Sequence, residues 1–201
     1  MTVIKNGVGN GDLAKVDSDN RLWVDSRSSE VEGSEALRGK AFIIHARCKM
    51  GAVASGGLLY IKNTSATENI IITRMYFDAH ILTPADGLII TQLKSPTPDV
   101  VLTGENITTT GVLNKKYDSG IPLGATVWAG GTTTKLGFSA LGTEYHSFVM
   151  ASKFSTQRDM KGTNVVTFNQ ILGIGFETFT GNATLNEVIS LSINCVAVPV
   201  S

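Results

Sequence analysis

Cysteine is scarce in this sequence, and no motif for metal binding or nucleophilic catalysis accompanies it. Cys48 and Cys195 lie far apart along the chain and fit no zinc-ligand spacing. Both alternate with polar neighbours, a pattern that directs the thiols toward a protein core, where a thiol is inert. We therefore expect two buried, reduced cysteines and no disulfide.

The histidines are equally isolated from one another. His45, His80 and His146 form no His-x-His pair, and each lies in the polar phase of its segment. A metal centre of the cupin type needs a close histidine pair, so this pattern favours solvated surface histidines. The sequence also lacks a Gly-x-Ser-x-Gly elbow, and the glycines of 7–11 follow no predicted strand and precede no predicted helix. It predicts that the protein is not an enzyme and binds no metal and no cofactor.

Neither an excess of one charge nor a long apolar run is present. The chain has 17 basic and 17 acidic residues, whereas capture of nucleic acid or an anionic membrane needs a basic excess or stripe. No stretch approaches the roughly 20 apolar residues that cross a bilayer, and the first residues do not resemble a secretory signal. We expect a protein made in a cytoplasm, with neither nucleic acid nor membrane as a partner.

What the sequence has in abundance is alternation of apolar and polar residues with a period of two, which is typical of half-buried strands. The clearest strands are 40–49, 69–82 and 187–200. Further candidates are 57–63, 88–93, 99–103, 125–130, 135–140, 145–151, 164–179 with a break inside it, and 183–187. Segments rich in glycine, proline, threonine and asparagine separate them.

Helix is almost missing from the pattern. Only 34–40 looks helical, with Ser34 as a candidate N-cap and Gly39 as a candidate stop. Many short strands with so little helix indicate a β-sandwich or a barrel. Because the strands number eight or more and their connections vary in length, we predict an all-β, jelly-roll-like two-sheet β-sandwich.

The alternation also predicts which side chains face the core. In 69–82, one face carries Ile71, Thr73, Met75, Phe77, Ala79 and Ile81, and in 187–200 one face carries Ile189, Leu191, Ile193, Cys195 and Ala197. The same alternation leaves Ile70 and Ile72 in 69–82, and Ile43 in 40–49, pointing outward. Identical subunits would cover these side chains.

The first 38 residues differ in composition from the rest of the chain. In the segment 15–30, short apolar groups flank Asp17-Ser18-Asp19-Asn20, which favours a small hairpin with a turn at these residues. We therefore divide the chain into an extended N-terminal arm, residues 1–38, and a β-sandwich domain, residues 39–201.

The arm has one concentrated apolar group, Leu22, Trp23 and Val24. So small a group does not offset a backbone entropy of roughly 1–2 kcal/mol per ordered residue. We expect the arm to gain order on a neighbouring subunit, with Trp23 as the main anchor.

The segments VDSDNRLWVDSRSS, GKAFIIHA and LLYIKNTSATENIIITRMYF together resemble virion structural proteins of tailed bacteriophages. The nearest types are small β-sandwich proteins that decorate or cement the head or lie in the tail. The similarity is one of pattern and covers roughly residues 1–80. It implies localisation in the virion, an assembly role without catalysis, a trimer or higher homo-oligomer, and the major capsid or other virion proteins as partners.

The leading functional hypothesis is a capsid decoration, cement or head-associated protein that stabilises the particle through contacts made by the arm. A tail or baseplate component is the alternative within the same class. A carbohydrate-binding module for receptor recognition is an alternative from another class, with Trp128 and Tyr145 as possible surface aromatic contacts. Core packing is the competing interpretation of these two aromatic residues.

Overall fold

The computed structural model of this chain describes residues 15–16, 22–23, 31–50, 55–80, 88–95, 105–130, 143–150, 155–178 and 187–200. The chain divides into two units, Met1–Val31 and Glu32–Ser201. In the first unit, β1 (Lys15–Val16) and β2 (Leu22–Trp23) pair antiparallel, with Lys15 opposite Trp23. The two strands lie on either side of the predicted turn, whose residues lie outside the described residues.

The rest of the described chain is almost entirely β. Its single described helix is α1 (Val31–Leu37). The strands that follow are β3 (Ala41–Met50), β4 (Ser55–Asn63), β5 (Glu68–His80), β6 (Leu88–Ser95), β7 (Glu105–Asn106), β8 (Val112–Asn114), β9 (Ala125–Ala129), β10 (Thr143–Met150), β11 (Ser155–Val166), β12 (Ile171–Thr178) and β13 (Glu187–Pro199).

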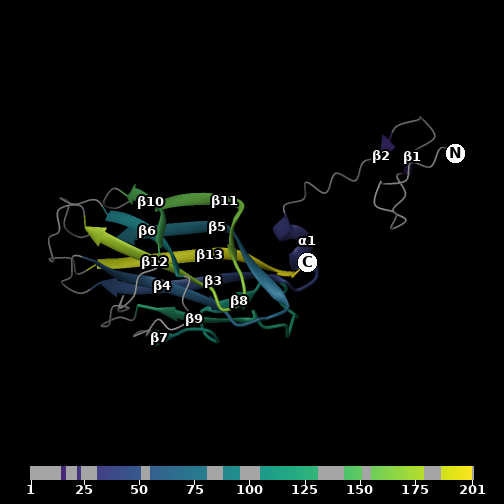
Figure 1. The fold of residues 1–201 in the computed structure, drawn as a ribbon, viewed down its shortest axis with the longest axis horizontal. Coiled ribbons are helices and arrows are strands. Elements are labelled where there is room, and N and C mark those ends of the chain that lie inside the picture. Colours follow the sequence, from purple (N-terminus) through teal and green to yellow (C-terminus); the bar gives the residue numbers. More distant parts are fainter. Residues whose placement is uncertain are drawn as a thin grey trace. The chain divides into compact units, whose positions relative to one another are not determined.

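These strands form two antiparallel sheets, as Figure 1 shows. The five-stranded sheet has the order β11-β5-β13-β3-β8, and the six-stranded sheet has the order β10-β6-β12-β4-β9-β7. Apart from β7, β8 and β9, strands pair from the two ends of the series inward: β3 with β13, β4 with β12, β5 with β11 and β6 with β10. This nested pairing is the jelly-roll order, so the predicted fold class is confirmed.

The core lies between the two sheets. In β13 the buried side chains follow the predicted phase: Ile189, Leu191, Ile193, Cys195 and Ala197. The outward positions of the same strand include Ser190 and Ser192, which are half-buried. Alternation in this strand therefore places one face in the core and leaves Ser190 and Ser192 on the other face.

Both cysteines are free and buried, as the sequence predicts. Burial raises the pKa of each thiol to about 12. Cys48 lies opposite Ile189, whereas Cys195 lies opposite Phe42, so the register separates the two thiols by about 20 Å along the strands. A disulfide between them is excluded in this fold.

Strand β5 departs from the predicted phase in its first half. Ile70 and Ile72 are fully buried in the core, together with Met75, Phe77 and Ala79 from the second half. The prediction that Ile70 and Ile72 point outward is therefore wrong. The inward orientation predicted for the second half is confirmed.

A bulge at Thr73 explains the change of phase. Asn194 lies opposite Arg74, but the next residue of β13, Cys195, lies opposite Ile72. Thr73 is therefore an extra residue in β5, and one extra residue exchanges the two faces of everything beyond it.

Helix α1 starts before the predicted N-cap, because Ser34 lies inside it. Its end is as predicted. Gly39 has a positive φ of 72°, its N–H donates to Ala36 O at 3.0 Å, and the Lys40 N–H donates to Glu35 O at 2.7 Å. These are the two bonds of a Schellman cap.

Three strand segments were missed by the pattern: β7, β8 and the first half of β11. The predicted strands 99–103 and 135–140, and most of 183–187, lie outside the described residues. Strands β7, β8 and β9 all come from residues 105–130, and they extend both sheets beyond the eight jelly-roll strands.

Two glycine substitutions test the cap. At Gly39, a Cβ would lie 2.5 Å from Ser119 Oγ and the backbone is left-handed, whereas at Gly33 in α1 nothing lies within 4 Å. We expect Gly39→Ala to lower the free energy of unfolding by about 1–2 kcal/mol or more, and Gly33→Ala to raise it by about 0.5–1 kcal/mol. Urea denaturation measures both, and shifts of the same sign would contradict this account.

Candidate functional site

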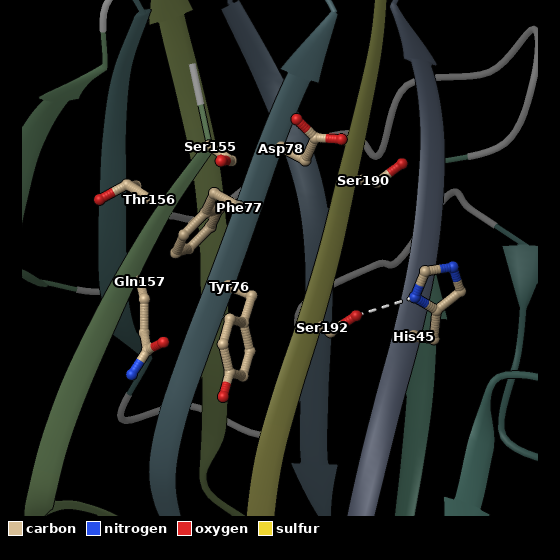
Figure 2. Close-up of a pocket in the computed structure, with 9 residues that line it drawn as sticks. All are labelled: His45, Tyr76, Phe77, Asp78, Ser155, Thr156, Gln157, Ser190 and Ser192. Atoms are coloured by element: carbon tan, nitrogen blue, oxygen red, sulfur yellow. Dashed lines mark hydrogen bonds between the residues drawn. The ribbon is translucent and has the colours of Figure 1, made fainter.

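A polar groove of about 670 Å³ lies on the five-stranded sheet (Figure 2). It occupies the outer face, which we define as the face directed away from the six-stranded sheet. Strands β3, β5, β11 and β13 provide its lining. The lining residues are His45, Tyr76, Phe77, Asp78, Ser155, Thr156, Gln157, Ser190 and Ser192.

The strand register arranges the outward side chains in two neighbouring rows. The first row runs Gln157, Tyr76, Ser192 and His45, and the second runs Ser155, Asp78, Ser190 and Arg47. Each row crosses four strands, so its side chains come from segments that are distant in sequence. Antiparallel pairing alone therefore assembles the groove.

One side of the groove is a hydrogen-bonded pair. His45 Nδ1 lies 2.9 Å from Ser192 Oγ, and the His45 side chain is exposed, as the sequence predicts. Behind it, the His45 N–H donates to Gly111 O at 2.7 Å, and a Cβ at Gly111 would lie 2.7 Å from His45 O. Glycine is thus required where this backbone approaches β3. The side chains of His80 and His146 lie outside the described residues.

The opposite side of the groove is held by the carboxylate of Asp159. Arg74 Nε donates to Asp159 at 2.6 Å and Gln157 Nε2 donates to it at 3.2 Å. Arg74 Nη1 also donates to the Tyr76 hydroxyl at 3.2 Å. The hydrogen bonds with Tyr76 and Asp159 raise the pKa of Arg74. The network fixes Tyr76 and Gln157 and engages the arginine charge.

The groove presents binding chemistry. Ser192 and His45 are hydrogen-bonded. Asp78 lies in the neighbouring row, opposite Ser190, and does not join them as the third member of a catalytic triad would. Hydroxyls, an imidazole, an amide and a carboxylate therefore lie side by side on the outer face of the sheet. Such a set donates and accepts hydrogen bonds from a polar ligand.

The core contains a polar pair that joins the two sheets. Asn164 Nδ2 donates to Gln92 Oε1 at 3.1 Å, and Gln92 Nε2 lies 3.2 Å from Met75 Sδ. Both amides are buried. Within the described ranges, no three His, Cys, Asp or Glu side chains are grouped to hold a metal ion. We assign the amide pair a structural role, because a buried amide needs a hydrogen-bond partner and these two supply one for each other.

Glu32 of α1 binds the bulge on the outer face. Its carboxylate accepts hydrogen bonds from Thr73 Oγ1 at 2.9 Å and Asn194 Nδ2 at 3.0 Å, and it pairs with Lys115 Nζ. Residues 32–38 therefore pack with the sandwich, although the sequence pattern grouped them with the arm. Near this contact Ala41 and Val196 are fully buried, outside the main core cluster.

The pKa of Glu32 reflects two opposing effects. Burial raises it, but the hydrogen bonds from Lys115 and Thr73, with the charges of Lys115 and Arg74, outweigh burial and hold the pKa below its usual value. The folded protein therefore prefers the ionised carboxylate.

The predicted aromatic contacts are not brought together. Trp128 is half-buried on β9, opposite Tyr60 and Asn106, and Tyr145 belongs to β10, with its side chain outside the described residues. Three strands separate β9 from β10, a distance of about 19 Å across the sheet. Of the predicted arm anchor, Leu22 and Trp23 lie in β2, and Val24 lies outside the described residues.

Sequence reasoning missed the groove although part of its signal was visible. Tyr76, Asp78, Ser190, Ser192 and His45 lie in the polar phases of three predicted strands. Which of them become neighbours depends on register, and the fourth strand, β11, had not been predicted over its first half. The groove thus follows from pairing, which alternation within one segment does not specify.

No protein-family model matches the chain, and no curated protein matches it. In the part of the chain that the structure describes, no helix is long and apolar enough to span a membrane.

Glu32→Gln tests the contact at the bulge. The amide keeps the shape but removes the charge, so we expect a loss of about 1–2 kcal/mol in unfolding free energy at pH 7. Because the pKa of Glu32 is lower in the folded protein than the unfolded value near 4.5, the ionised carboxylate stabilises the folded protein above that pH. This stabilisation is lost as the pH falls through the folded-state pKa. Urea denaturation at several pH values should show the difference between the two proteins shrinking as the pH falls below 4.5.

Glu35→Gln is the matched control on the same helix. The Glu35 side chain is exposed as little as that of Glu32, but its carboxylate pairs at 3.1 Å with Arg38, which is mostly exposed and whose charge is therefore screened by solvent. We expect a change of about 0–1 kcal/mol. An equal loss in both variants, or a loss for Glu32→Gln that is independent of pH, would contradict the specific role of Glu32.

Proposed function

We propose that this chain is a non-enzymatic structural protein of a tailed-bacteriophage virion, namely a capsid decoration, cement or head-associated protein. Two observations support the class. The first is the resemblance of residues 1–80 to such proteins. The second is the jelly-roll strand order, which recurs in viral capsid proteins and also in lectins. A shared fold supports a function only by analogy, so the specific function must be argued from the surface of the protein.

The observation that carries the proposal is a group of exposed apolar side chains, here called the apolar rim. Its members are Leu37, Leu113, Tyr117 and Ile121, with exposed fractions of 81%, 57%, 106% and 39%. The Asn114 amide joins their segments, because Nδ2 donates to Gly39 O at 2.8 Å and to Ile121 O at 3.0 Å. Grouped exposed apolar side chains are typical of a protein contact surface.

Identical subunits and neighbouring virion proteins are the proposed occupants of the apolar rim. The rim borders β8, an edge strand of 3 residues. Such a short edge offers little for sheet extension, so contacts through side chains are favoured over strand addition. Identical copies that meet through one surface close most simply with cyclic symmetry, and a trimer is the form that the resemblance implies.

Leu113→Glu tests the rim in the full-length protein. We expect the wild type to be multimeric by light scattering at micromolar concentration and to be found by mass spectrometry in purified virions. The charged side chain should weaken association by about 2 kcal/mol or more. Val149→Glu is the control, since Val149 is 60% exposed on β10. A monomeric wild type that is missing from virions would overturn the proposal.

The arm supplies a second test of assembly. Deletion of residues 1–30 leaves Glu32 and Gly39 in place, so we expect a folded sandwich by circular dichroism. Incorporation into particles should fall, and Trp23→Ala in the full chain should reproduce most of the loss, because a buried aromatic anchor contributes about 2 kcal/mol or more. Full incorporation of both variants would show that the arm does not attach the protein to its neighbours in the particle.

A tail or baseplate protein would use the apolar rim and the arm in the same way. Mass spectrometry of separated heads and tails distinguishes the two locations, and enrichment in the head fraction is the expected result.

A further inference from the structure

We infer that the polar groove binds a short neutral oligosaccharide, which lies across strands β11, β5, β13 and β3. This binding site is independent of the assembly proposed above, because none of the groove residues belongs to the apolar rim.

The dimensions of the groove fit such a ligand. A row across four strands spans about 14 Å, and its neighbour lies about 7 Å further along the strands. The volume of about 670 Å³ falls in the range of ligand sites. In Figure 2 the Tyr76 ring lies between Gln157 and Ser192, at the middle of the first row.

The chemistry of the lining matches sugar hydroxyls. Each hydroxyl of a sugar both donates and accepts, and the serines and Gln157 do the same, while Asp78 accepts only. The half-buried ring of Tyr76 adds an apolar surface for the carbon-bound face of a sugar ring. Polar groups that converge beside one aromatic ring therefore favour a polyhydroxylated ligand.

Other ligand classes fit less well. A phosphate or nucleic acid would meet the Asp78 carboxylate, while Arg74 is engaged by Asp159 and Tyr76. Arg47, at the end of the second row, does not line the groove. An apolar peptide would find no anchor, because none of the exposed large hydrophobic residues among the described ranges lines the groove. The ligand is therefore neutral and polar.

The groove is organised before any ligand binds. Asp159 fixes Arg74 and Gln157, Arg74 fixes the Tyr76 hydroxyl, and Ser192 fixes His45. All four positioning strands belong to the jelly roll, with β5 and β13 inside the sheet. Side chains held in this way lose little freedom on binding, which favours affinity for a weakly binding ligand class.

The experiment uses the full-length protein and isothermal titration with maltotetraose, cellotetraose, mannotetraose and tetra-N-acetylchitotetraose, with a sulfated tetrasaccharide for comparison. We expect at least one neutral sugar to bind, with an affinity that changes little between low and high salt. Asp78→Ala and Gln157→Ala, both at exposed positions, should weaken binding about tenfold or more. Tyr76→Ala should do the same, and Tyr76→Phe should retain most of the affinity.

Phe168→Ala is the matched control, since Phe168 is an exposed aromatic residue that neither lines the groove nor belongs to the apolar rim. Its affinity for the sugar should equal that of the wild type. The inference is overturned if no neutral sugar binds at millimolar concentration, if only the sulfated sugar binds, or if Asp78→Ala and Gln157→Ala bind as tightly as the wild type. Loss of virion incorporation has no bearing on it.

Discussion

The outer face depends on one extra residue in β5. Because Thr73 bulges from the pairing with β13, Ile70 and Ile72 enter the core at one end while Arg74, Tyr76 and Asp78 point outward beyond it. The side-chain donors at the bulge, Thr73 Oγ1 and Asn194 Nδ2, both find their acceptor in the Glu32 carboxylate. The same feature thus divides the outer face into a part that binds α1 and a part that remains an open polar groove.

Several charged and amide side chains of the described sandwich are used in pairs. Lys115 meets Glu32, Arg74 meets Asp159, and Gln92 meets Asn164 between the sheets. Asn63, fully buried, donates to Glu68 O and Val166 O, each at 2.8 Å, and so joins two connections. Matched polar groups add modest stability, but they penalise every alignment of strands that would separate them.

The sequence predicted the fold class because jelly-roll strands here are long and alternate clearly, as in β13. It failed at Thr73, where a run of β-branched residues, Ile70 to Thr73, reads equally well in either phase. Strand β8 is too short to show a period, and the first half of β11 is rich in charged and polar residues. The groove was beyond prediction for a different reason: Tyr76, Ser192 and His45 become neighbours only through register, which no single segment encodes.

The place of β13 in the sheet has a consequence for how the chain folds. This last strand of the series lies between β3 and β5, two of the earliest. During synthesis, β3 and β5 have unpaired hydrogen-bonding edges and exposed isoleucines until β13 has been synthesised. Contacts between such distant segments slow folding and prolong exposure to aggregation. The middle of the five-stranded sheet therefore forms only after β13 has been synthesised.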